Sequence, residues 1–412
     1  MGNCAGAGKK LFRSQIRMKR ILFVEDNEVL LQLYGILLAD ESDQWQTTVA
    51  PDGQTAMELL RRSAFDVVAS DMQMPGMSGI ELLTEVRKLY PQTSRIIISG
   101  VTDQAEAADS LNCTHLFIPK PFDVTTLKAT LARIGSLDAY LKDDKLRGLA
   151  GKMRALPSFP MLYLEIIREI ESPKSSIQGI AKIVAKDPGI TAKILQIANS
   201  AAFGLPEPVN DPVEAVQLLG MTTVRSLVLS AQVYSSFHSA RLKKFSANAL
   251  WTHLMKCGDL ARTIMRRERT SFAESEDAFT AGMLHDMGKL MLADSLPKEF
   301  EKALTLAEKE KIPLPEAELE IFGATHTGLA AYLFGLWGLP AAIVEAVAFH
   351  HTPEKSDLKK FSALTAVHVA NALCDESEAA NLNLDYLAQI GVADRLDDWR
   401  DTAAELAMEQ VA

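Results

Sequence analysis

The sequence predicts two joined parts, an N-terminal α/β part built on a parallel sheet and a C-terminal part made entirely of helices. In residues 20–134, short apolar runs alternate with segments of helical apolar spacing, as in parallel sheets that helices cover on both faces. Residues 136–155 are rich in lysine and arginine, and a proline-rich break follows them. From residue 161 to about residue 373, nearly every segment has helical spacing and stops near a proline.

Five strands alternating with helices are expected in the first part. The expected strands are 21–24, 47–50, 66–70, 95–99 and 115–119. The expected helices include 29–38, 53–62, 80–88 and 123–134. Isoleucines in the fourth strand favour extended backbone, while Arg61 and Arg62 suit the negative end of a helix. The alternation predicts a doubly wound parallel sheet of five βα units.

Changes in pattern along the chain suggest where the domains begin and end. We expect a flexible leader over 1–18, the α/β domain over 19–135, a basic helical linker over 136–155, the helical domain over 156–375 and an acidic helical extension over 376–412. Met18 stands directly before the first strand and is an alternative to Met1 as the start of translation.

Composition narrows the class of protein. A chain of 412 residues is long for one domain, and 48% hydrophobic residues can fill real cores. The formal charge of −10 argues against nucleic-acid binding by the whole chain. Four cysteines without metal-type spacing favour a reducing cytoplasm. The chain contains no uncharged apolar run of about 18 residues, so no membrane span is expected.

Charged side chains follow three of the expected strands. Glu25 and Asp26 follow the first strand, Asp71 ends the third before a Pro-Gly turn, and Lys120 follows the fifth. A single acid in such a place would be read as a solvated loop residue. Because the carboxyl ends of parallel strands meet at one edge of a sheet, we expect these four groups to converge.

Three converging carboxylates repel one another and need a counterion. Oxygen ligands favour Mg²⁺, so Glu25, Asp26 and Asp71 are the expected metal ligands. With the metal and Lys120 neutralising an incoming phosphoryl group, Asp71 is the expected nucleophile and phosphoacceptor. Ser99, at the end of the fourth strand, has a hydroxyl placed to bond a phosphoryl oxygen, so Lys120 and Ser99 are the expected catalytic helpers.

About residues 19–135 resemble the receiver domain of bacterial response regulators, which has a flavodoxin-like fold. The resemblance is carried by the Glu25-Asp26 pair, the run from Asp71 to Gly76, Ser99-Gly100 and Lys120-Pro121-Phe122. It implies phosphotransfer to Asp71 from a sensor histidine kinase or a phosphotransfer protein. It also implies that Ser99 and Phe117 are switch residues, which move when Asp71 is phosphorylated. Glu25 stands where the family more often has aspartate.

Histidines are the notable feature of the helical part. The ones weighed together are His253, His285, His326, His350, His351 and His368. A His-Asp dipeptide on one helix, with histidines on other helices, can build a metal site inside a bundle, and imidazole with carboxylate suits Fe, Mn or Zn. Such a site could activate water for phosphoester hydrolysis. Taken singly, each histidine reads as a core or surface residue, and His350-His351 as a helix cap.

Two other features of this part are read as structural. Cys257 lies four residues after His253 and is interpreted as core packing rather than as a ligand. The arginines at 262, 266, 267 and 269 are interpreted as a solvated helix face rather than as a phosphate contact.

About residues 150–373 resemble the HDOD domain, a relative of the HD metal-dependent phosphohydrolases. The resemblance is carried by segments 156–160, 187–190, 194–200, 215–220, 282–289, 337–340 and 350–351. It implies that His253, His285 and Asp286 match metal ligands of HD hydrolases, with Asn371 where those enzymes have aspartate. His326, His350 and His351 join them as tentative ligands. The Gly-Tyr-Pro segment of HD-type cyclic-di-GMP phosphodiesterases is absent after His351.

Together these features predict a cytoplasmic two-component response regulator of bacterial type. Phosphorylation at Asp71 is expected to change how the helical domain engages a protein partner, such as a cyclic-di-nucleotide enzyme, and the chain could form a homodimer. The alternative is an HD-type phosphohydrolase that phosphorylation regulates, acting on a nucleotide or cyclic dinucleotide. A transcription factor is disfavoured by the acidic charge and by the lack of a helix-turn-helix candidate.

Overall fold

The computed structural model describes most of the chain in two compact units, Met1–Lys152 and Met153–Ala412, which we treat separately. The described residues are 18–37, 45–100, 113–120, 161–187, 209–235, 242, 244–337, 339–374 and 381–409, with isolated positions in 124–131, 146–150 and 190–198. Within them, no helix is long and apolar enough to cross a membrane.

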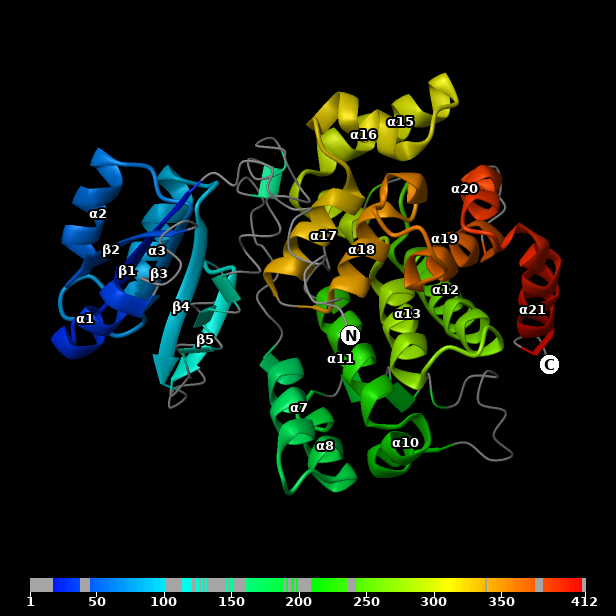
Figure 1. The fold of residues 1–412 in the computed structure, drawn as a ribbon, viewed down its shortest axis with the longest axis horizontal. Helices are drawn as coiled ribbons and strands as arrows, with labels where there is room; N and C mark the ends of the chain where they lie inside the picture. The colour runs from blue at the N-terminus through cyan, green and yellow to red at the C-terminus, as the bar shows by residue number, and fades with distance from the viewer. Residues whose placement is uncertain are drawn as a thin grey trace, which may run out of the picture. The chain divides into compact units, whose positions relative to one another are not determined.

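The N-terminal unit contains the predicted parallel sheet. Its strands are β1 (Lys19–Val24), β2 (Trp45–Ala50), β3 (Val67–Asp71), β4 (Ser94–Gly100) and β5 (Leu116–Lys120). They pair in parallel in the order β2-β1-β3-β4-β5 (Figure 1). The prediction of a doubly wound sheet is confirmed, and each strand lies within two residues of its expected bounds. Because β1 and β3 are neighbours, the residues that follow them stand side by side.

Helices cover this sheet, and side chains cap two of them at the N-terminus. They are α1 (Glu28–Leu37), α2 (Gly53–Arg62) and α3 (Gly79–Leu89). Asp52 caps α2 by accepting from the N–H of Thr55, and Ser78 forms a capping box with Glu81 at the start of α3. The expected helix at 123–134 is helical at its described positions, and residues 101–112 lie outside the described part.

Gly79 allows α3 to begin directly against the end of β3. Its N–H donates to the carbonyl of Met72 at 2.9 Å. A Cβ at this position would lie 2.0 Å from the carbonyl oxygen of Asp71, which no side chain could tolerate without a backbone shift. Glycine is therefore required here, and the close approach fixes the backbone on which Asp71 stands.

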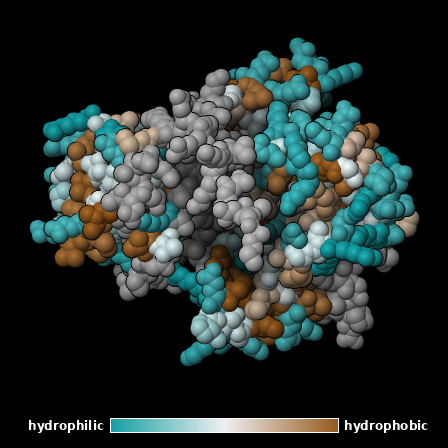
Figure 2. All heavy atoms as spheres, viewed as in Figure 1, coloured by the Kyte–Doolittle hydropathy of each residue, from teal (hydrophilic) through white to brown (hydrophobic). Residues whose placement is uncertain are grey.

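An apolar stripe remains exposed on α1. Val29, Leu33 and Ile36 are 75%, 41% and 68% exposed, and they recur at helical spacing. Figure 2 shows hydrophobic residues over this helix. The opposite face of α1 packs inward through Tyr34, whose ring stacks on Phe23 of β1.

The second unit is helical, as predicted. Its helices are α7 (Met161–Glu171), α8 (Ile177–Val184), α10 (Pro212–Leu219), α11 (Met221–Ser235), α12 (Ala247–Arg267), α13 (Phe272–Leu284), α14 (Met287–Ser295), α15 (Pro297–Glu310), α16 (Leu314–Phe322), α17 (His326–Leu336), α18 (Ala341–Phe349), α19 (Ala363–Cys374), α20 (Leu384–Gln389) and α21 (Leu396–Glu409). Two short 3₁₀ helices, η3 (Pro353–Lys355) and η5 (Ala393–Arg395), lie between them. Prolines stand at the start of several helices, as Pro212 does in α10 and Pro340 does before α18, which agrees with the predicted breaks.

Two glycines bring α12 and α13 unusually close. A Cβ on Gly282 would lie 2.7 Å from the Cα of Gly258, so the two backbones touch at this level. The contact places His253 and Cys257 of α12 beside His285, the residue that follows α13. Helix α19 packs against both. The three helices therefore form the frame that positions the polar residues of this unit.

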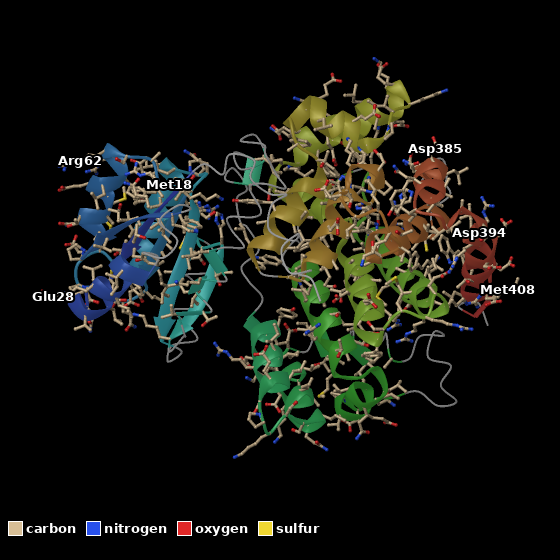
Figure 3. The ribbon with its side chains drawn as sticks, viewed as in Figure 1. Met18, Glu28, Arg62, Asp385, Asp394 and Met408 are labelled. Atoms are coloured by element: carbon tan, nitrogen blue, oxygen red, sulfur yellow. The ribbon has the colours of Figure 1, made fainter. Side chains whose placement is uncertain are left out.

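The C-terminal extension is packed rather than free. Trp399 is 1% exposed and donates from Nε1 to Glu268 at 3.0 Å. The hydroxyl of Tyr386 hydrogen-bonds Thr365 of α19 at 2.8 Å. Figure 3 labels Asp385, Asp394 and Met408 along this extension. Its helices thus complete the surface of α12 and α19.

A buried arginine and histidine pair joins β4 to the segment before β5. Arg95 is 1% exposed, and its guanidinium donates to the carbonyls of Cys113 and Thr93 at 2.7 and 2.9 Å. Its Nη2 lies 2.6 Å from Nε2 of His115, and its backbone N–H donates to Nδ1 of the same ring. Burial, together with the charge of Arg95, holds the pKa of His115 well below its usual value, so this histidine is neutral in the fold.

The neutral state of His115 predicts a pH-dependent stability. Below the unfolded pKa of about 6.5, the unfolded chain takes up a proton that the folded chain cannot, so stability falls as the pH falls, by about 1.4 kcal/mol per pH unit. His115→Gln should lower stability near pH 7 yet flatten this acid-side slope. Urea unfolding of the full chain between about pH 7 and about pH 5 measures both slopes. Equal slopes in the two proteins would contradict the assignment.

Candidate functional site

The carboxyl edge of the N-terminal sheet gathers the predicted acidic residues. One oxygen from each of Glu25, Asp26 and Asp71 lies within 4.8 Å of the others. The register of the sheet explains why these carboxylates are close. Val24 of β1 pairs with Ser70 of β3, so the next residues, Glu25 and Asp71, stand side by side. Glu25 is buried whereas Asp26 is exposed. The donors are all carboxylate oxygens, which fit a hard divalent cation such as Mg²⁺.

Lys120 bridges two of these carboxylates. Its ammonium lies 2.8 Å from Oε2 of Glu25 and 3.2 Å from Oδ2 of Asp71. Burial raises the pKa of Glu25 above its usual value, and the hydrogen bond from Lys120 opposes that effect. The other oxygen of Asp71 accepts from the N–H of Met72 at 2.8 Å. Asp71 remains 15% exposed, so an incoming group can reach it.

For Ser99 and Phe117, the other two residues predicted for this site, the structure describes only the backbone positions. Ser99 lies in β4 opposite Pro119, and Phe117 lies in β5 opposite Ile97. The side chains of Ser99 and Phe117 are outside the described atoms, so their expected roles remain predictions.

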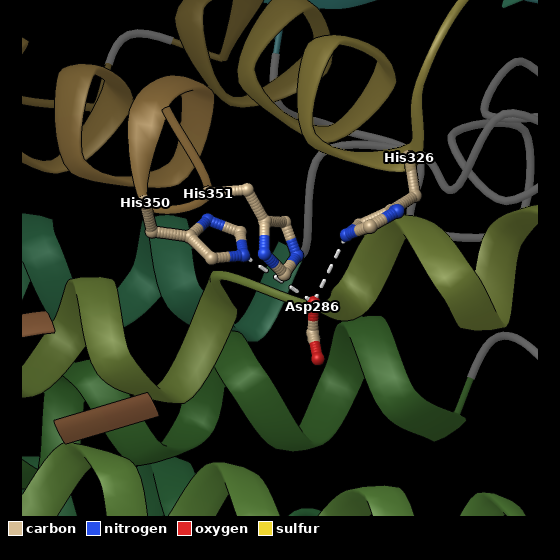
Figure 4. A group of neighbouring side chains, drawn as sticks. All are labelled: Asp286, His326, His350 and His351. Atoms are coloured by element: carbon tan, nitrogen blue, oxygen red, sulfur yellow. Dashed lines mark ion pairs between the residues drawn. The ribbon is translucent and has the colours of Figure 1, made fainter. Parts of the chain in front are cut away.

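A second polar cluster lies inside the helical unit. Asp286, His326, His350 and His351 each offer one atom that could bind a metal ion, and these four atoms all lie within 4.8 Å of one another (Figure 4). Asp286 stands between α13 and α14, His326 begins α17, and the two adjacent histidines follow α18. Oδ1 of Asp286 lies 3.1 Å from Nε2 of His326 and 3.5 Å from Nε2 of His350.

Neighbouring acceptors fix how two of these rings point. Nδ1 of His326 lies 2.7 Å from Oε2 of Glu318, a fully buried carboxylate, and Nδ1 of His350 donates to the carbonyl of Val347 at 3.0 Å. With the protons held on Nδ1, the Nε2 atoms face the cluster, which is how histidine ligands of metals are oriented. Neither Nε2 has a well-directed hydrogen bond in the described structure, nor has Oδ1 of Asp286.

Charges inside this cluster are unevenly distributed. Burial alone would raise the pKa of Asp286, but Lys289 and His285 hold it well below its usual value. Burial likewise opposes protonation of His326, yet the charge of Glu318 and the contact with Asp286 raise its pKa to about 9. Burial lowers the pKa of His350 to about 3. A protonated His326 therefore supplies the positive charge of the cluster when no cation is bound.

The remaining predicted ligands form a separate group around Asn371 of α19. Its Oδ1 lies 2.9 Å from Nε2 of His253 and 3.2 Å from Nε2 of His285. Those two nitrogens are 3.3 Å apart, and Sγ of Cys257 is 3.4 Å from that of His253. The structure thus arranges the seven predicted residues in two adjacent groups that meet at Asp286. Its Oδ1 faces His326 and His350, and its Oδ2 lies 3.5 Å from Nε2 of His285.

His368 stands outside both groups. Its Nδ1 donates to the carbonyl of His350 at 2.7 Å, and its Nε2 accepts from the N–H of Asn383 at 3.0 Å. It therefore supports a cluster residue and anchors the C-terminal extension. Of the six histidines that the sequence analysis weighed together, five lie in the two groups and His368 does not.

The arginines at the end of α12 and just after it match the predicted solvated face at Arg266, Arg267 and Arg269, which are exposed, but not at Arg262. Arg262 is buried, donates to Asp259 at 2.6 Å and lies over the ring of Phe279, so it is not part of a solvated face. Arg266 pairs with the buried Glu276 at 3.1 Å, and Arg267 pairs with Glu405. These three arginines are neutralised by carboxylates, which leaves little charge for a phosphate.

Sequence reasoning missed two residues of the histidine cluster. Glu318, on α16, orients His326 from eight positions earlier in the chain, and nothing in the local pattern signals that contact. Lys289 pairs with Asp286 at 2.6 Å, and its i+3 spacing from a helix-start acid could have indicated the pair.

Comparisons with known proteins agree with both units. A family model for the response regulator receiver domain matches residues 21–132, and one for the HDOD domain matches residues 156–353. Chemotaxis protein CheY-3 of Vibrio cholerae is 32% identical over 119 residues, which is 28% of this chain and 90% of CheY-3. A response regulator receiver protein of Anaeromyxobacter is 34% identical over 108 residues, 26% of this chain and 44% of that protein.

A solved structure supports the fold of the helical unit. An HDOD domain protein of unknown function from Geobacter sulfurreducens covers 67% of this chain and 96% of its own, with a TM-score of 0.54 and 24% identity. Two curated relatives that align over 203 and 207 residues are each covered over only 39% of their own length. Similarity at this level concerns the fold and the domains.

Gly288 offers a test of how the histidine cluster is held together. A Cβ there would lie 2.0 Å from the carbonyl oxygen of His326, so Gly288→Ala must push α14 away from α17 and separate Asp286 from His326. We expect a loss of about 1–3 kcal/mol in the free energy of unfolding. Gly35→Ala, whose Cβ meets only an ordinary contact at 3.9 Å, is the control and should not destabilise. Equal urea midpoints for Gly288→Ala and the unaltered chain would refute the close packing.

Proposed function

We propose that this chain, which belongs to the response regulators and joins a receiver domain to an HDOD domain, is phosphorylated on Asp71 and signals through its helical domain by binding a protein partner. One observation carries the first part: Asp71 lies among Glu25, Asp26 and Lys120 at the carboxyl edge of the sheet, partly exposed and in contact with the lysine. The donor of the phosphoryl group would be a sensor histidine kinase or a phosphotransfer protein.

The residues around Asp71 suit phosphoryl transfer. Oδ2 of Asp71 would form the new P–O bond as the donor's bond to phosphorus breaks, while its Oδ1 stays oriented by the N–H of Met72. Mg²⁺ held by Glu25, Asp26 and Asp71 would neutralise the phosphoryl oxygens. Lys120, already 3.2 Å from Asp71, would bind a phosphoryl oxygen and stabilise the charge that develops.

Phosphorylation would act by changing a charge balance that already exists. The ammonium of Lys120 is shared between Glu25 and Asp71, so the phosphoryl oxygens added to Asp71 would compete for it. We propose that Ser99 and Phe117 follow this change on β4 and β5. The signal can then pass only through a difference between two states of the domain, since a phosphoryl group shifts an equilibrium by its differential interactions.

The helical domain is proposed to be the output, with boundaries near 156–375 and the acidic extension beyond. A binding role is favoured by the way Lys289 already occupies one oxygen of Asp286 and by the neutral Asn371 in the adjacent group. Both features reduce the negative charge that a catalytic metal ion needs in its ligands. A cyclic-di-nucleotide enzyme or a second copy of this chain is a possible partner class.

A second candidate function is metal-dependent phosphohydrolysis by the helical domain. The observation that favours it is the convergence of Asp286, His326, His350 and His351, with buried donor atoms that lack well-directed hydrogen bonds at Asp286, His326 and His350. Imidazole and carboxylate would hold Fe, Mn or Zn, and such an ion would supply activated water.

Labelling with acetyl phosphate tests the phosphoacceptor. We expect the full chain to be labelled in the presence of Mg²⁺ and Asp71→Asn to lose the label, because the amide cannot act as the nucleophile. Asp52→Asn is the control, since asparagine also caps a helix and should leave α2 and the labelling intact. Label that persists on Asp71→Asn would rule out the assignment. A pull-down with both forms of the chain then reports which partners depend on the phosphoryl group.

A hydrolysis assay with added metal ions distinguishes the binding role from the phosphohydrolase. If the helical domain only binds a partner, the purified full chain should not hydrolyse nucleotides or cyclic dinucleotides when Fe, Mn or Zn is supplied. Turnover that disappears in His326→Ala, with phosphorylation of Asp71 retained, would replace the binding role by the phosphohydrolase.

A further inference from the structure

We propose that Cys257 and Cys374 form a reversible disulfide when the chain is exposed to a peroxide, and that this bond locks α19 to α12. The inference goes beyond the proposed function, since it needs neither phosphorylation of Asp71 nor a bound metal ion. It also gives Cys257 a chemical role beside the core packing that its place in the sequence indicates.

The two thiols meet across the contact between α12 and α19, which pack against each other. Sγ of Cys257 points at α19 and donates to the carbonyl of Ala370 at 3.8 Å. Cys374 follows Ala370 by four residues, so it stands one turn further along the same face of α19. The side chains of Cys257 and Cys374 are hydrogen-bonded to each other. Because the thiols are already in contact, rotation of the two side chains can bring the sulfurs toward the S–S bonding distance of about 2.0 Å.

The two cysteines differ in how a reagent reaches them. Cys257 is fully buried, whereas Cys374, the last residue of α19, is partly exposed. An oxidant in solution therefore reacts first with Cys374. Burial also raises the pKa of the Cys257 thiol well above its usual value, which agrees with this order because a protonated thiol is a poor nucleophile toward solutes. Cys257 is the neighbour that resolves the oxidised Cys374.

The oxidant that the reaction requires is a hydroperoxide. The thiolate of Cys374 attacks one peroxide oxygen, an S–O bond forms as the O–O bond breaks, and the hydroxide that leaves takes up the proton that the thiol had released. The sulfur of Cys257 then attacks the sulfenic acid of Cys374, and the S–S bond forms as the S–O bond breaks. The second hydroxide leaves with the thiol proton of Cys257. Two thiols are oxidised, and one peroxide is reduced to water.

The resting form of this pair is the dithiol. Cys113, Cys257 and Cys374, the cysteines in the described part of the chain, are all free. In the reducing compartment that the cysteine pattern favours, a disulfide is transient and acts in redox sensing or catalysis. Cys374 lies beyond residues 156–353, which the HDOD model matches, so that match does not include the pair.

Oxidation would also change the polar group beside Cys257. Its Sγ lies 3.4 Å from Nε2 of His253, and bonding to Cys374 would turn the sulfur toward α19 and consume the thiol proton. His253 would then keep only its contacts with His285, Asn371 and Asp286 in this group. Since Asn371 stands on α19, the same bond would hold that contact in place.

Peptide mapping of the full chain tests the bond. The reduced protein, kept in a chelator, is treated with hydrogen peroxide, its remaining thiols are alkylated, and a tryptic digest is read by mass spectrometry. We expect a linked pair of peptides that joins Cys257 to Cys374 and disappears with dithiothreitol. An alkylated Cys257, or a bond from either cysteine to Cys4 or Cys113, would overturn the proposal.

Thiol counting in variants of the full chain gives a matched control. The chain has four cysteines, so Cys4→Ser with Cys113→Ser retains only the proposed pair, and peroxide should remove both remaining thiols reversibly. Adding Cys374→Ser leaves Cys257 alone, and its buried thiol should then stay free. Two thiols that survive in the double variant, or a Cys257 thiol that is lost from the triple variant, contradict the pairing. The mapping of the unaltered chain does not depend on how these variants fold.

Urea unfolding of the full chain tests the lock. The midpoint should rise after peroxide treatment, because a bond between helices far apart in the sequence restricts the unfolded chain, and dithiothreitol should restore it. Cys374→Ser treated in the same way should show no rise. An unchanged or lower midpoint in the oxidised chain would refute the lock. Labelling of Asp71 is read in parallel, so failure of this pair and failure of the proposed function remain distinguishable.

Discussion

Each unit holds a buried carboxylate with one lysine, and both polar sites depend on that pairing. Lys120 lies 2.8 Å from Glu25, and Lys289 lies 2.6 Å from Asp286; both carboxylates are 2% exposed. An unpaired charge at that depth would cost several kcal/mol. The two lysines differ in what they leave free. Lys120 also contacts Asp71, a partly exposed carboxylate that can react. Lys289 contacts one oxygen of Asp286, and the other oxygen faces the imidazoles of His326 and His350.

The imidazoles show how distant contacts determine the chemistry of a side chain. Glu318 directs Nε2 of His326 inward by taking Nδ1, and main-chain carbonyls do the same for His285 and His350. Burial keeps His350 neutral while the neighbouring acids keep His326 charged. Identical residue types therefore differ in charge within a few ångströms because of second neighbours rather than position in the sequence.

Most of the sheet could be predicted from sequence because its signals are local. Apolar runs of strand length, capping residues such as Ser78 and the acids after β1 and β3 each depend on a few consecutive residues. The division of the histidine residues into two groups could not be predicted, because it depends on the contact between Gly258 and Gly282, which brings helices from separate parts of the chain together. Burial of Arg262 was missed for a related reason: Asp259 is a partner on the same helix, but Glu276 and Phe279, which also contact Arg262, lie on the next helix.

Helix α19 lies beyond the end of the HDOD match, and this matters when the chain is divided into fragments. The HDOD match ends at residue 353, yet Asn371 and His368 stand on α19, and His368 joins the backbone of His350 to that of Asn383. A fragment cut at the edge of the match would keep every histidine of the Asp286 group while removing the support behind His350 and one corner of the group around Asn371. The domain boundary indicated by family similarity therefore differs from the boundary indicated by hydrogen bonds and packing in the interior of this protein.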